Sequence, residues 1–529
     1  MAAAATRIVT TYPVFNQTWD EPAHIAAGME WIDRGTYTYE PLHPPLARVL
    51  TAIGPRLAGV RSGGHENVWL EGNSILYAGG RYDRNLALAR LGVLPFFLLA
   101  SLVVFLWGNR IGGLPTAAGA VLLFTTLPPI LAHAGLATTD MAVTAGIILA
   151  AYCASAWLER PTIRRSLLLG ASVAAAGLSK FSALLFLPAA AAAIAFVRWR
   201  TRPRGRERTP PPPRTRGIRA AYLAALFAVW AGYRFAVGPL IPASPTPADA
   251  PSAGGTFERL AAAPVFPAPA FFEGLGQLAA KNRAGHKSYL LGEVRDTGWW
   301  YFFPVALGVK TPLAFILLVI AGAFAAVRAP GGPERHRWLE PLAIAIALLV
   351  VCLPSRINIG LRHVLPLYPF LSIIAGMGLV SLMRSRRARP LEALAAALLL
   401  LWHLAVIVKA HPDYLPYFNE LAGEHPERIL VDSDLDSGQD LKRLADTLRA
   451  RRISSVWLAY AGSATVTQHG LPPVRWLEPH RPVKGWIAAS LYSLKLGSLG
   501  RPGYDDFAWL EQYDPVARVG HSIRLYYVP

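Results

Sequence analysis

The sequence predicts a polytopic α-helical membrane protein that carries a small α/β domain at its C-terminal end. Of its 529 residues, 53% are hydrophobic and only 16% are charged, a balance more apolar than that of typical soluble domains. Several apolar runs approach the ~20 residues that a helix needs to cross a bilayer. After residue 410 these runs end, and short patterns typical of strands and of one amphipathic helix follow.

Ten apolar runs are candidates for membrane spans. They occupy residues 86–107, 114–132, 140–158, 166–179, 181–197, 218–237, 304–327, 339–353, 363–383 and 391–409. The fourth and fifth runs are short, and only Ser179 and Lys180 join them. We therefore expect these two runs to form a helical hairpin that does not cross the membrane completely.

The net charge of +19 comes mostly from arginines that lie between the apolar runs. Arg-rich loops follow every second run, and the densest of them spans residues 198–219. Because loops rich in Lys and Arg stay on the cytoplasmic side of a membrane, we expect this basic loop to be cytoplasmic. The pattern favours membrane orientation over nucleic-acid binding, so no nucleic-acid partner is expected. The bias toward Ala, Arg and Pro suggests a bacterial genome, and hence a multi-pass protein of the bacterial inner membrane.

The same alternation divides the chain into three regions. Residues 1–85 form a first extracytoplasmic segment, residues 86–409 a transmembrane core, and residues 410–529 an extracytoplasmic α/β domain. The segments expected to face outward are 1–85, 133–140, 238–303, 354–362 and 410–529. Residues 1–85 must then be exported, but Ala2–Ala5 is too short for the apolar core of a signal peptide. We hypothesise that the translation start lies further upstream and that another spanning helix precedes Tyr12.

The last region shows the patterns of a small α/β domain. Strands are predicted at 428–432, 455–460, 485–490 and 523–528, and a helix at 439–452. The acidic stretch from Asp432 to Asp440 lacks the closing Glu of an EF-hand calcium loop. We interpret it as a strand-to-helix turn, with Asp436 or Ser437 near the helix cap.

Asp20 and Glu21 form an adjacent acidic pair before the first apolar run. Pro22 follows, and a short helix is predicted to end near Gly35. In a structural interpretation, Asp20 only caps this helix. In a functional interpretation, Asp20 is a general base or a metal ligand at a helix tip that faces a membrane cavity, and Glu21 orients the proton. Charged groups near a bilayer are costly and tend to mark function.

Asp140 is a second acidic candidate, at the start of the third run. Thr139 or Asp140 could simply cap that helix. Asp140 nevertheless lies at the same expected membrane depth as Asp20, so the two carboxylates could together hold a divalent cation. No cofactor is otherwise required. The two cysteines, Cys153 and Cys352, lie in apolar runs, so no disulfide framework and no cysteine-based metal site are expected.

Basic residues cluster in two of the outward-facing segments. Lys281, Arg283 and His286 lie in the outer loop 238–303, where topology does not favour positive charge. Arg offers bidentate contacts to phosphate, and Lys and His offer charge, so we predict a phosphate-binding role. For Arg362 and His363, which border a shorter outer loop, a second phosphate clamp and simple snorkelling to the membrane surface remain equal alternatives.

In their order along the chain, these motifs resemble a bacterial branch of family 39 of the glycosyltransferase C superfamily, which includes protein O-mannosyltransferases and lipid A aminoarabinose transferases. The resemblance covers most of the chain. It is carried by Asp20-Glu21-Pro22-Ala23-His24, His43-Pro44-Pro45-Leu46, Thr139-Asp140, Ser179-Lys180-Phe181, Gly285-His286-Lys287-Ser288-Tyr289, Gly298-Trp299-Trp300-Tyr301, Lys310-Thr311-Pro312, Asn358-Ile359-Gly360-Leu361-Arg362-His363 and Asp436-Ser437-Gly438-Gln439-Asp440.

The resemblance implies a glycosyltransferase C fold and the transfer of a sugar from a polyprenyl-phosphate carrier to a protein, lipid or polysaccharide acceptor at the extracytoplasmic face. Asp20 matches the base, Glu21 its partner, and Asp140 a second acidic position that helps to bind metal or acceptor. The residues matched to the carrier phosphate are Lys281, Arg283, His286, Arg362 and His363. Those assigned to substrate positioning are His43, Tyr289 and Glu293.

The chemistry implied is a displacement at the anomeric carbon. A phosphate leaving group needs its charge neutralised, and an acceptor hydroxyl needs a base, so one base acting directly predicts inversion. Two other classes are a transporter or flippase of lipid-linked sugars and a non-catalytic membrane scaffold. Transporters place polar groups at the bilayer midplane and often have repeated halves. Here the polar groups collect on one face and the halves differ, which favours the enzyme.

Overall fold

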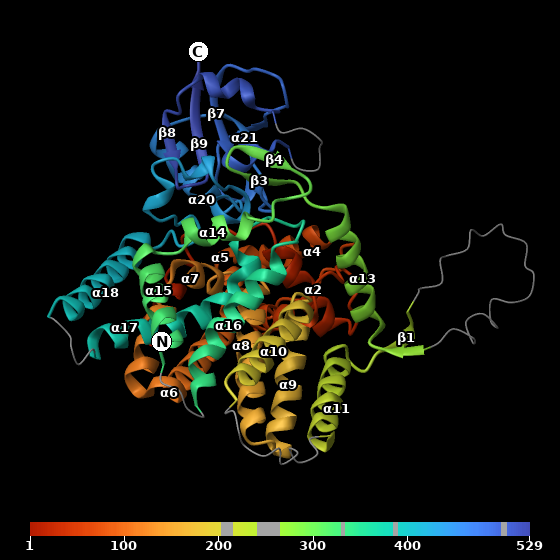
Figure 1. The fold of residues 1–529 in the computed structure, drawn as a ribbon. Helices are drawn as coiled ribbons and strands as arrows, with labels where there is room; N and C mark the ends of the chain where they lie inside the picture. Colours follow the sequence, from red (N-terminus) through yellow and green to blue (C-terminus); the bar gives the residue numbers. More distant parts are fainter. Residues whose placement is uncertain (203–214, 241–264, 330–333, 385–389, 499–504) are drawn as a thin grey trace, which may run out of the picture.

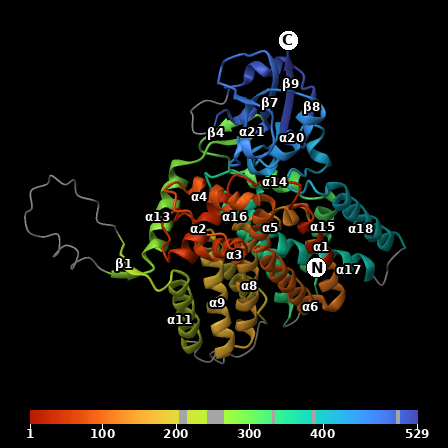
Figure 2. The ribbon, with the colours of Figure 1, turned by 180° about the vertical axis from the view of Figure 1, so that it is seen from behind.

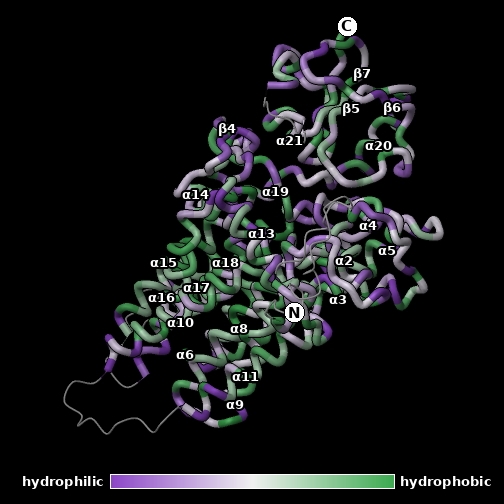
Figure 3. The backbone as a smooth tube through the Cα atoms, turned by 90° about the vertical axis from the view of Figure 1, so that its right-hand side faces the viewer, coloured by the Kyte–Doolittle hydropathy of each residue, from purple (hydrophilic) through white to green (hydrophobic). Residues whose placement is uncertain are grey.

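A computed structural model describes residues 1–202, 215–240, 265–329, 334–384, 390–498 and 505–529. The molecule has two parts: a large helical body, and a C-terminal domain with a sheet that sits on one end of it (Figure 1). The tube in Figure 3 is mainly hydrophobic through the long helices of the body, and polar segments gather toward the C-terminal domain and the opposite helix ends. The predicted fold class is confirmed.

Five helical segments in the described part of the chain are long and apolar enough to cross a membrane, and a bent pair would make six. This is fewer than the ten runs that the sequence suggested, because the first two runs fall mostly within one of these segments and several other runs form shorter or broken helices. The five segments are Tyr82–Phe124, Asp140–Glu159, Ala183–Arg200, Leu361–Met383 and Pro390–Ala410. The run at 304–327 is the bent pair, in which α14 (Phe302–Lys310) and α15 (Leu313–Val327) meet at 112°.

The first two apolar runs fold back on each other. Most of both runs lies in α6 (Leu94–Phe124), which is broken at Gly112 and Gly113, where Gly113 has a φ of 74° that side-chain-bearing residues rarely adopt. The rings of Phe97 and Phe124 then lie 6.2 Å apart, although 27 positions separate them in the sequence. The two arms of α6 are therefore antiparallel, as expected if the runs 86–107 and 114–132 are two separate segments.

The fourth and fifth runs form the predicted pair of helices, α9 (Ile163–Ser179) and α10 (Ala183–Arg200), joined through Lys180. Only α10 is among the helices long and apolar enough to span. The turn between α8 (Asp140–Glu159) and α9 lies at the end of the body opposite the C-terminal domain (Figure 1). Residues 203–214 of the basic loop and 241–264 of the outer loop are outside the described residues.

The remaining helices of the body complete this arrangement. They are α1 (Ala2–Val9), α2 (Glu21–Asp33), α3 (Pro45–Leu57), α4 (Val68–Leu76), α5 (Tyr82–Leu91), α7 (Pro128–Ala134), α11 (Thr215–Gly232), α13 (Pro269–Ala284), α16 (Arg335–Cys352), α17 (Tyr368–Arg384) and α18 (Pro390–Ala410). The aromatic run 299–303 is mostly buried: Trp299, Phe302 and Phe303 lie in the core, and of the two tryptophans only Trp300 is exposed.

Helices α2 to α5 form a layer directly beneath the C-terminal domain (Figure 2). Hydrogen bonds join the two parts, since the side chains of Gln17 and Asn73 both donate to the carbonyl of Ser463. Within the layer, α2 and α3 approach closely at Gly28, where a Cβ would lie 2.0 Å from the carbonyl oxygen of Arg48. The first segment of the chain is therefore fixed between the membrane helices and the C-terminal domain.

The C-terminal domain is built on a five-stranded mixed sheet with the order β6-β5-β7-β9-β8. Its strands are β5 (Val456–Ala459), β6 (Val474–Trp476), β7 (Gly485–Ser490), β8 (Ala517–Val519) and β9 (Ile523–Val528). β5 runs parallel to β6 and β7, and β9 runs antiparallel to β7 and β8. Helix α20 (Leu441–Ala450) packs Leu441, Leu444 and Leu448 against this sheet. Three predicted strands and the predicted helix are confirmed.

The predicted strand at 428–432 is wrong. A short 3-10 turn, Pro426–Arg428, is followed by the one-turn helix α19 (Asp432–Leu435). Val431 packs against Leu435 and Tyr289 rather than in the sheet. The apolar residues of this stretch are buried, but they do not form a strand. The cap of α20 is Asp440, not the expected Asp436 or Ser437.

Outside the main sheet, β1 (Val237–Pro239) pairs with β2 (Val265–Pro267), and β3 (Ser288–Leu290) with β4 (Glu293–Arg295).

Candidate active site

A cavity of about 750 Å³ lies where the helical body meets the C-terminal domain. All five segments that the sequence predicted on one side of the membrane contribute to its walls. The contributing side chains include Trp19, Asp20, His24, Glu40, His43, Thr139, Asp140, Lys180, Lys281, His286, Lys287, Arg295, Arg362, His363, Asp432, Ser433, Asp436, Ser437 and Tyr492.

Asp20 faces this cavity and is paired with Arg362. It occupies the N-cap position of α2, but its side chain makes no capping hydrogen bond, so the capping interpretation is wrong. Its carboxylate instead accepts a hydrogen bond from Nη1 of Arg362. Burial acts to raise the pKa of Asp20, but Arg362, together with His24 and His43, holds that pKa well below its usual range. The side chains of Asp20 and Arg362 are 28% and 15% exposed, so both remain accessible from the cavity.

Asp140 forms a second ion pair on the same cavity. It begins α8, and its Oδ1 lies 2.6 Å from Nζ of Lys180, the residue that joins α9 to α10. Thr139 occupies the N-cap position but makes no side-chain capping bond. The pairing explains why a lysine interrupts two apolar runs: it reaches the carboxylate at the head of the neighbouring helix.

The basic residues predicted to bind phosphate divide into two groups. Lys281, His286, Arg362 and His363 line the cavity. Arg283 does not: its side chain is exposed and donates to the carbonyl of Ala279 on its own helix. Arg362 also carries a buried Nε–H that has no acceptor among the described residues. The cavity therefore has a basic side with unused hydrogen-bonding capacity.

Three further predicted residues lie outside the cavity. Glu21 is fully buried and binds Arg90, with oxygen–nitrogen distances of 2.8 and 2.9 Å. Tyr289 is buried in an apolar cluster with Val431 and Leu435. Glu293 is exposed on β4, where it pairs with Arg295. Neither a proton-orienting role for Glu21 nor direct positioning by the other two agrees with this placement.

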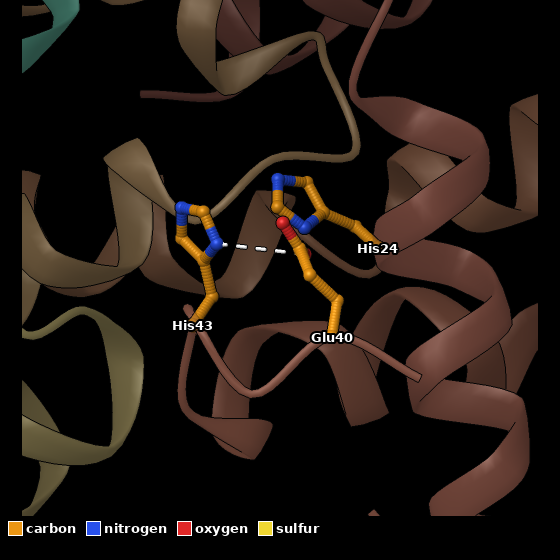
Figure 4. Close-up of side chains that lie close together, drawn as sticks. All are labelled: His24, Glu40 and His43. Carbon is orange, nitrogen blue, oxygen red and sulfur yellow. Dashed lines mark ion pairs between the residues drawn. The ribbon is translucent and has the colours of Figure 1, made fainter. Parts of the chain in front are cut away.

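His24, Glu40 and His43 bring possible metal-ligand atoms within 4.8 Å of one another (Figure 4). The fully buried guanidinium of Arg48 already occupies the space that these atoms face. Its Nε donates to Nδ1 of His24 at 3.0 Å, and its Nη2 bonds Glu40 and lies 3.3 Å from Nδ1 of His43. Burial, with a further contribution from Lys180, lowers the pKa of His43 to about 3. The group is a neutral-histidine cluster around an arginine, and it does not fit a metal.

The predicted metal ligands Asp20 and Asp140 line the same cavity, but each is bonded to a protein cation. A divalent ion would have to displace both Arg362 and Lys180 to bind them. The donor set therefore does not fit a metal in the described arrangement.

Sequence reasoning missed the contribution of the C-terminal domain. Asp432, Ser433, Asp436, Ser437 and Tyr492 all line the cavity. The pattern of the acidic stretch 432–440 predicts a turn, but nothing in it indicates which part of the protein its side chains face. Lys180 and His24 also line the cavity without having been predicted as site residues. Their place in the motifs Ser179-Lys180-Phe181 and Asp20-Glu21-Pro22-Ala23-His24 is the sequence feature that could have identified them.

Comparisons with known proteins agree with this architecture. A family model described as dolichyl-phosphate-mannose-protein mannosyltransferase matches residues 83–210. No curated protein sequence matches the chain. The crystal structure of ArnT from Cupriavidus metallidurans bound to undecaprenyl phosphate has a TM-score of 0.52 and 13% identity, covering 99% of this chain and 96% of that one.

Two further structures align with lower scores. The apo state of the same ArnT gives a TM-score of 0.49 at 13% identity, with the same coverage. The Archaeoglobus fulgidus oligosaccharyltransferase tethered with an acceptor peptide gives 0.44 at 10% identity, covering 94% of this chain and 68% of that one. The chain therefore shares the overall fold of ArnT, and residues 83–210 match the mannosyltransferase family model.

Proposed function

We propose that this protein transfers a sugar from a polyprenyl-phosphate carrier to an acceptor hydroxyl at the extracytoplasmic face of the bacterial inner membrane. The observation that carries the proposal is the Asp20–Arg362 pair, which opens into a cavity lined by all five segments predicted to face outward and by Lys180. The mannosyltransferase family match and the ArnT-like fold support it.

The basic side of the cavity suits the carrier phosphate. A polyprenyl phosphate is a good leaving group, provided that its charge is neutralised. Arg362 has a free Nε–H, and Lys281 is exposed at the cavity wall. We assign these two residues to the phosphate, with His286 and His363 on the same side.

Arg362 also connects donor binding to the base. While Arg362 pairs with Asp20, the low pKa of Asp20 makes this carboxylate a weak base. A phosphate that draws Arg362 away removes the main group that lowers the pKa of Asp20, and burial then raises it. Donor binding thus makes Asp20 a stronger base, whereas Asp20 stays a weak base while no donor is bound.

The transfer itself is a single displacement. The acceptor oxygen forms a bond to the anomeric carbon while the bond from that carbon to the phosphate oxygen breaks. The electron pair leaves with the phosphate, where Arg362 neutralises it, and the hydroxyl proton passes to Asp20. This route inverts the anomeric configuration. It requires no divalent cation, because Arg362 and Lys180 already supply positive charge beside the two carboxylates.

The test uses the full chain in nanodiscs, supplied with a panel of polyprenyl-phosphate sugars and hydroxyl acceptors, and measures release of the polyprenyl phosphate. We expect wild type to release the carrier from at least one donor and Asp20→Asn to lose that activity. Equal release by both proteins would remove Asp20 as the base. If folded wild-type protein moves lipid-linked sugar across the bilayer without cleaving any donor, the protein is a transporter and the proposal fails.

A further inference from the structure

The C-terminal domain supplies one wall of the cavity, through Asp432, Ser433, Asp436, Ser437, Ala461, Tyr492 and Ser498. The lysines, arginines and histidines that line the cavity all come from other segments of the described chain. This wall instead presents carboxylates and hydroxyls. The cavity therefore has two sides, one with basic residues and one, from the C-terminal domain, with hydroxyls and carboxylates. The two sides suit different ligands.

Asp432 is the distinctive group of this wall. Its carboxylate accepts one hydrogen bond, from the backbone N–H of Ser433 at 2.6 Å, and no cation pairs with it among the residues described. The other recessed carboxylates of the cavity have more partners or a cation: Asp20 pairs with Arg362, Asp140 with Lys180 and Glu40 with Arg48, and Asp436 accepts hydrogen bonds from the backbone N–H groups of Gly438 and Tyr492. Asp432 thus retains hydrogen-bonding capacity that the protein does not use.

The position of Asp432 relative to the reacting pair is fixed. The hydroxyl of Ser433 donates to the carbonyl of Ile359, and the N–H of Leu361 donates to Asp434 at 2.9 Å. These bonds hold the segment against the loop that carries Arg362. On the other side, the N–H of Trp19 donates to the carbonyl of Ser437 at 3.0 Å, which links the segment to the residue before Asp20.

The backbone at this point has little room to change. Asp432 has a φ of 37°, which is uncommon for a residue with a side chain. Gly360 has a φ of 153°, and a Cβ there would lie 2.4 Å from Oγ of Ser433. The close approach of the two loops therefore holds Asp432 in one place at the cavity wall.

We propose that residues 432–437 and Tyr492 form the acceptor subsite, that the acceptor is an uncharged saccharide, and that Asp432 binds a hydroxyl beside the one that reacts. This inference rests on the proposed function and adds the class of acceptor to it. Asp432 acts as a positioning residue, and the reacting proton still goes to Asp20.

The chemistry of the wall favours a saccharide. A sugar presents several hydroxyl donors in a compact unit, and carboxylates are strong acceptors for them. Trp19 and Tyr492 add aromatic surface beside these acceptors, a combination typical of sites that orient a polar ligand. An anionic acceptor would be repelled by Asp432 and would compete with the donor for the basic side. A polypeptide serine or threonine presents only one side-chain hydroxyl to the same wall.

The test compares wild type, Asp432→Asn and Asp432→Glu, each as the full chain in nanodiscs with the donor that wild type uses. The acceptor probes are maltose and a hexapeptide with one threonine. We expect maltose to be glycosylated and Asp432→Asn to raise its KM about tenfold or more, the effect of losing a hydrogen bond to a charged group. The kcat and the donor KM should stay within about twofold, and Asp432→Glu should recover part of the affinity.

A matched control is Asp446→Asn, which removes a carboxylate of the same domain that is 74% exposed and pairs with Arg449. It should leave all constants unchanged. An unchanged maltose KM in Asp432→Asn, a loss of kcat alone, or transfer to the peptide but not to maltose would each overturn the inference while leaving the transferase proposal intact. Absence of carrier release from folded wild type would instead refute the proposed function itself.

Discussion

Asp20 and Glu21 are neighbours in the sequence, but they belong to two different regions of the molecule. Glu21 lies in the framework beneath the cavity, where it accepts hydrogen bonds from Arg90, the backbone of Ala137 and both donors of Thr18. Arg90 in turn donates to the carbonyls of Tyr12, Phe15 and Asn16. Asp20 faces the cavity, and in the described part of the chain its one cation partner is Arg362, whose Nε–H has no acceptor there.

The difference shows how to distinguish a structural ion pair from a reactive one. The Glu21–Arg90 pair is satisfied on all sides, so a ligand could not take either partner without leaving a buried charge unpaired. The Asp20–Arg362 pair can exchange, because Arg362 has spare donors and both side chains reach the cavity. The predictions that follow, from the largest expected effect to the smallest, test this contrast.

The strongest effect should come from Asp20→Asn. Loss of a general base lowers kcat by about 10² to 10⁴-fold, while the fold should be unaffected because the amide can keep a hydrogen bond to Arg362. Carrier-release kinetics and thermal unfolding of the same preparation measure both quantities. A comparable loss of thermal stability would mean that Asp20 belongs to the framework after all.

Glu21→Gln should have the opposite profile. Removing one partner of a buried ion pair costs about 3–5 kcal/mol of stability, because Arg90 would remain charged and unpaired. The unfolding temperature in nanodiscs should fall sharply, and the folded fraction should retain its kcat. Normal stability together with lost turnover would assign Glu21 to the chemistry, against its placement outside the cavity.

Arg362→Lys should affect the donor side. Lys keeps the charge but loses the planar donor arrangement that can bridge Asp20 and a phosphate. We expect the donor KM to rise about tenfold and the acceptor KM to stay constant. Arg283→Lys is the matched control, since Arg283 lies outside the cavity and should tolerate the change. Equal effects of the two substitutions would argue against a specific role for Arg362.

A smaller, pH-dependent effect is expected from Asp432. Burial raises the pKa of Asp432 to about 7, with Arg362 opposing and Asp434 and Asp20 adding to the rise, and Tyr492 also faces it. Below that pH the protonated carboxyl is a weaker acceptor for hydroxyls, so kcat/KM for maltose should increase as pH rises through about 7. This rise of kcat/KM with pH should be absent in Asp432→Asn. If the rise persists in that variant, another group causes it.

The same raised pKa has a consequence for stability. The unfolded chain releases the Asp432 proton near the usual value of 3.8, whereas the folded protein holds it to about 7. The contribution of this group to stability therefore falls as pH rises across that interval.

The smallest effect should come from chelation. Treatment with EDTA should change carrier release by less than about twofold, because protein cations already stand beside Asp20 and Asp140. Loss of activity that Mn²⁺ or Mg²⁺ restores would show that a metal displaces Arg362 or Lys180 in the working enzyme.

The sequence by itself determined the class of the protein, most of its helices and three strands of its sheet. Apolar runs and period-two patterns are local, and they form helices and strands wherever the surroundings permit. The alternating arginines also assigned five distant segments to one side, and those segments are the ones that meet around the cavity. The sequence also identifies as site candidates seven residues that line the cavity: Asp20, His43, Asp140, Lys281, His286, Arg362 and His363.

Only the tertiary structure decided which candidates share the cavity. Consecutive helical side chains point about 100° apart, so Asp20 and Glu21 had to face different surroundings, but no local pattern says which of them faces the cavity. The contacts that decide this join residues 5 to more than 70 positions apart. They are those of Arg48 with His24 and His43, of Lys180 with Asp140, and of Ser433, next to Asp432, with Ile359. Such contacts depend on how helices and domains pack, and that information is distributed over the whole chain.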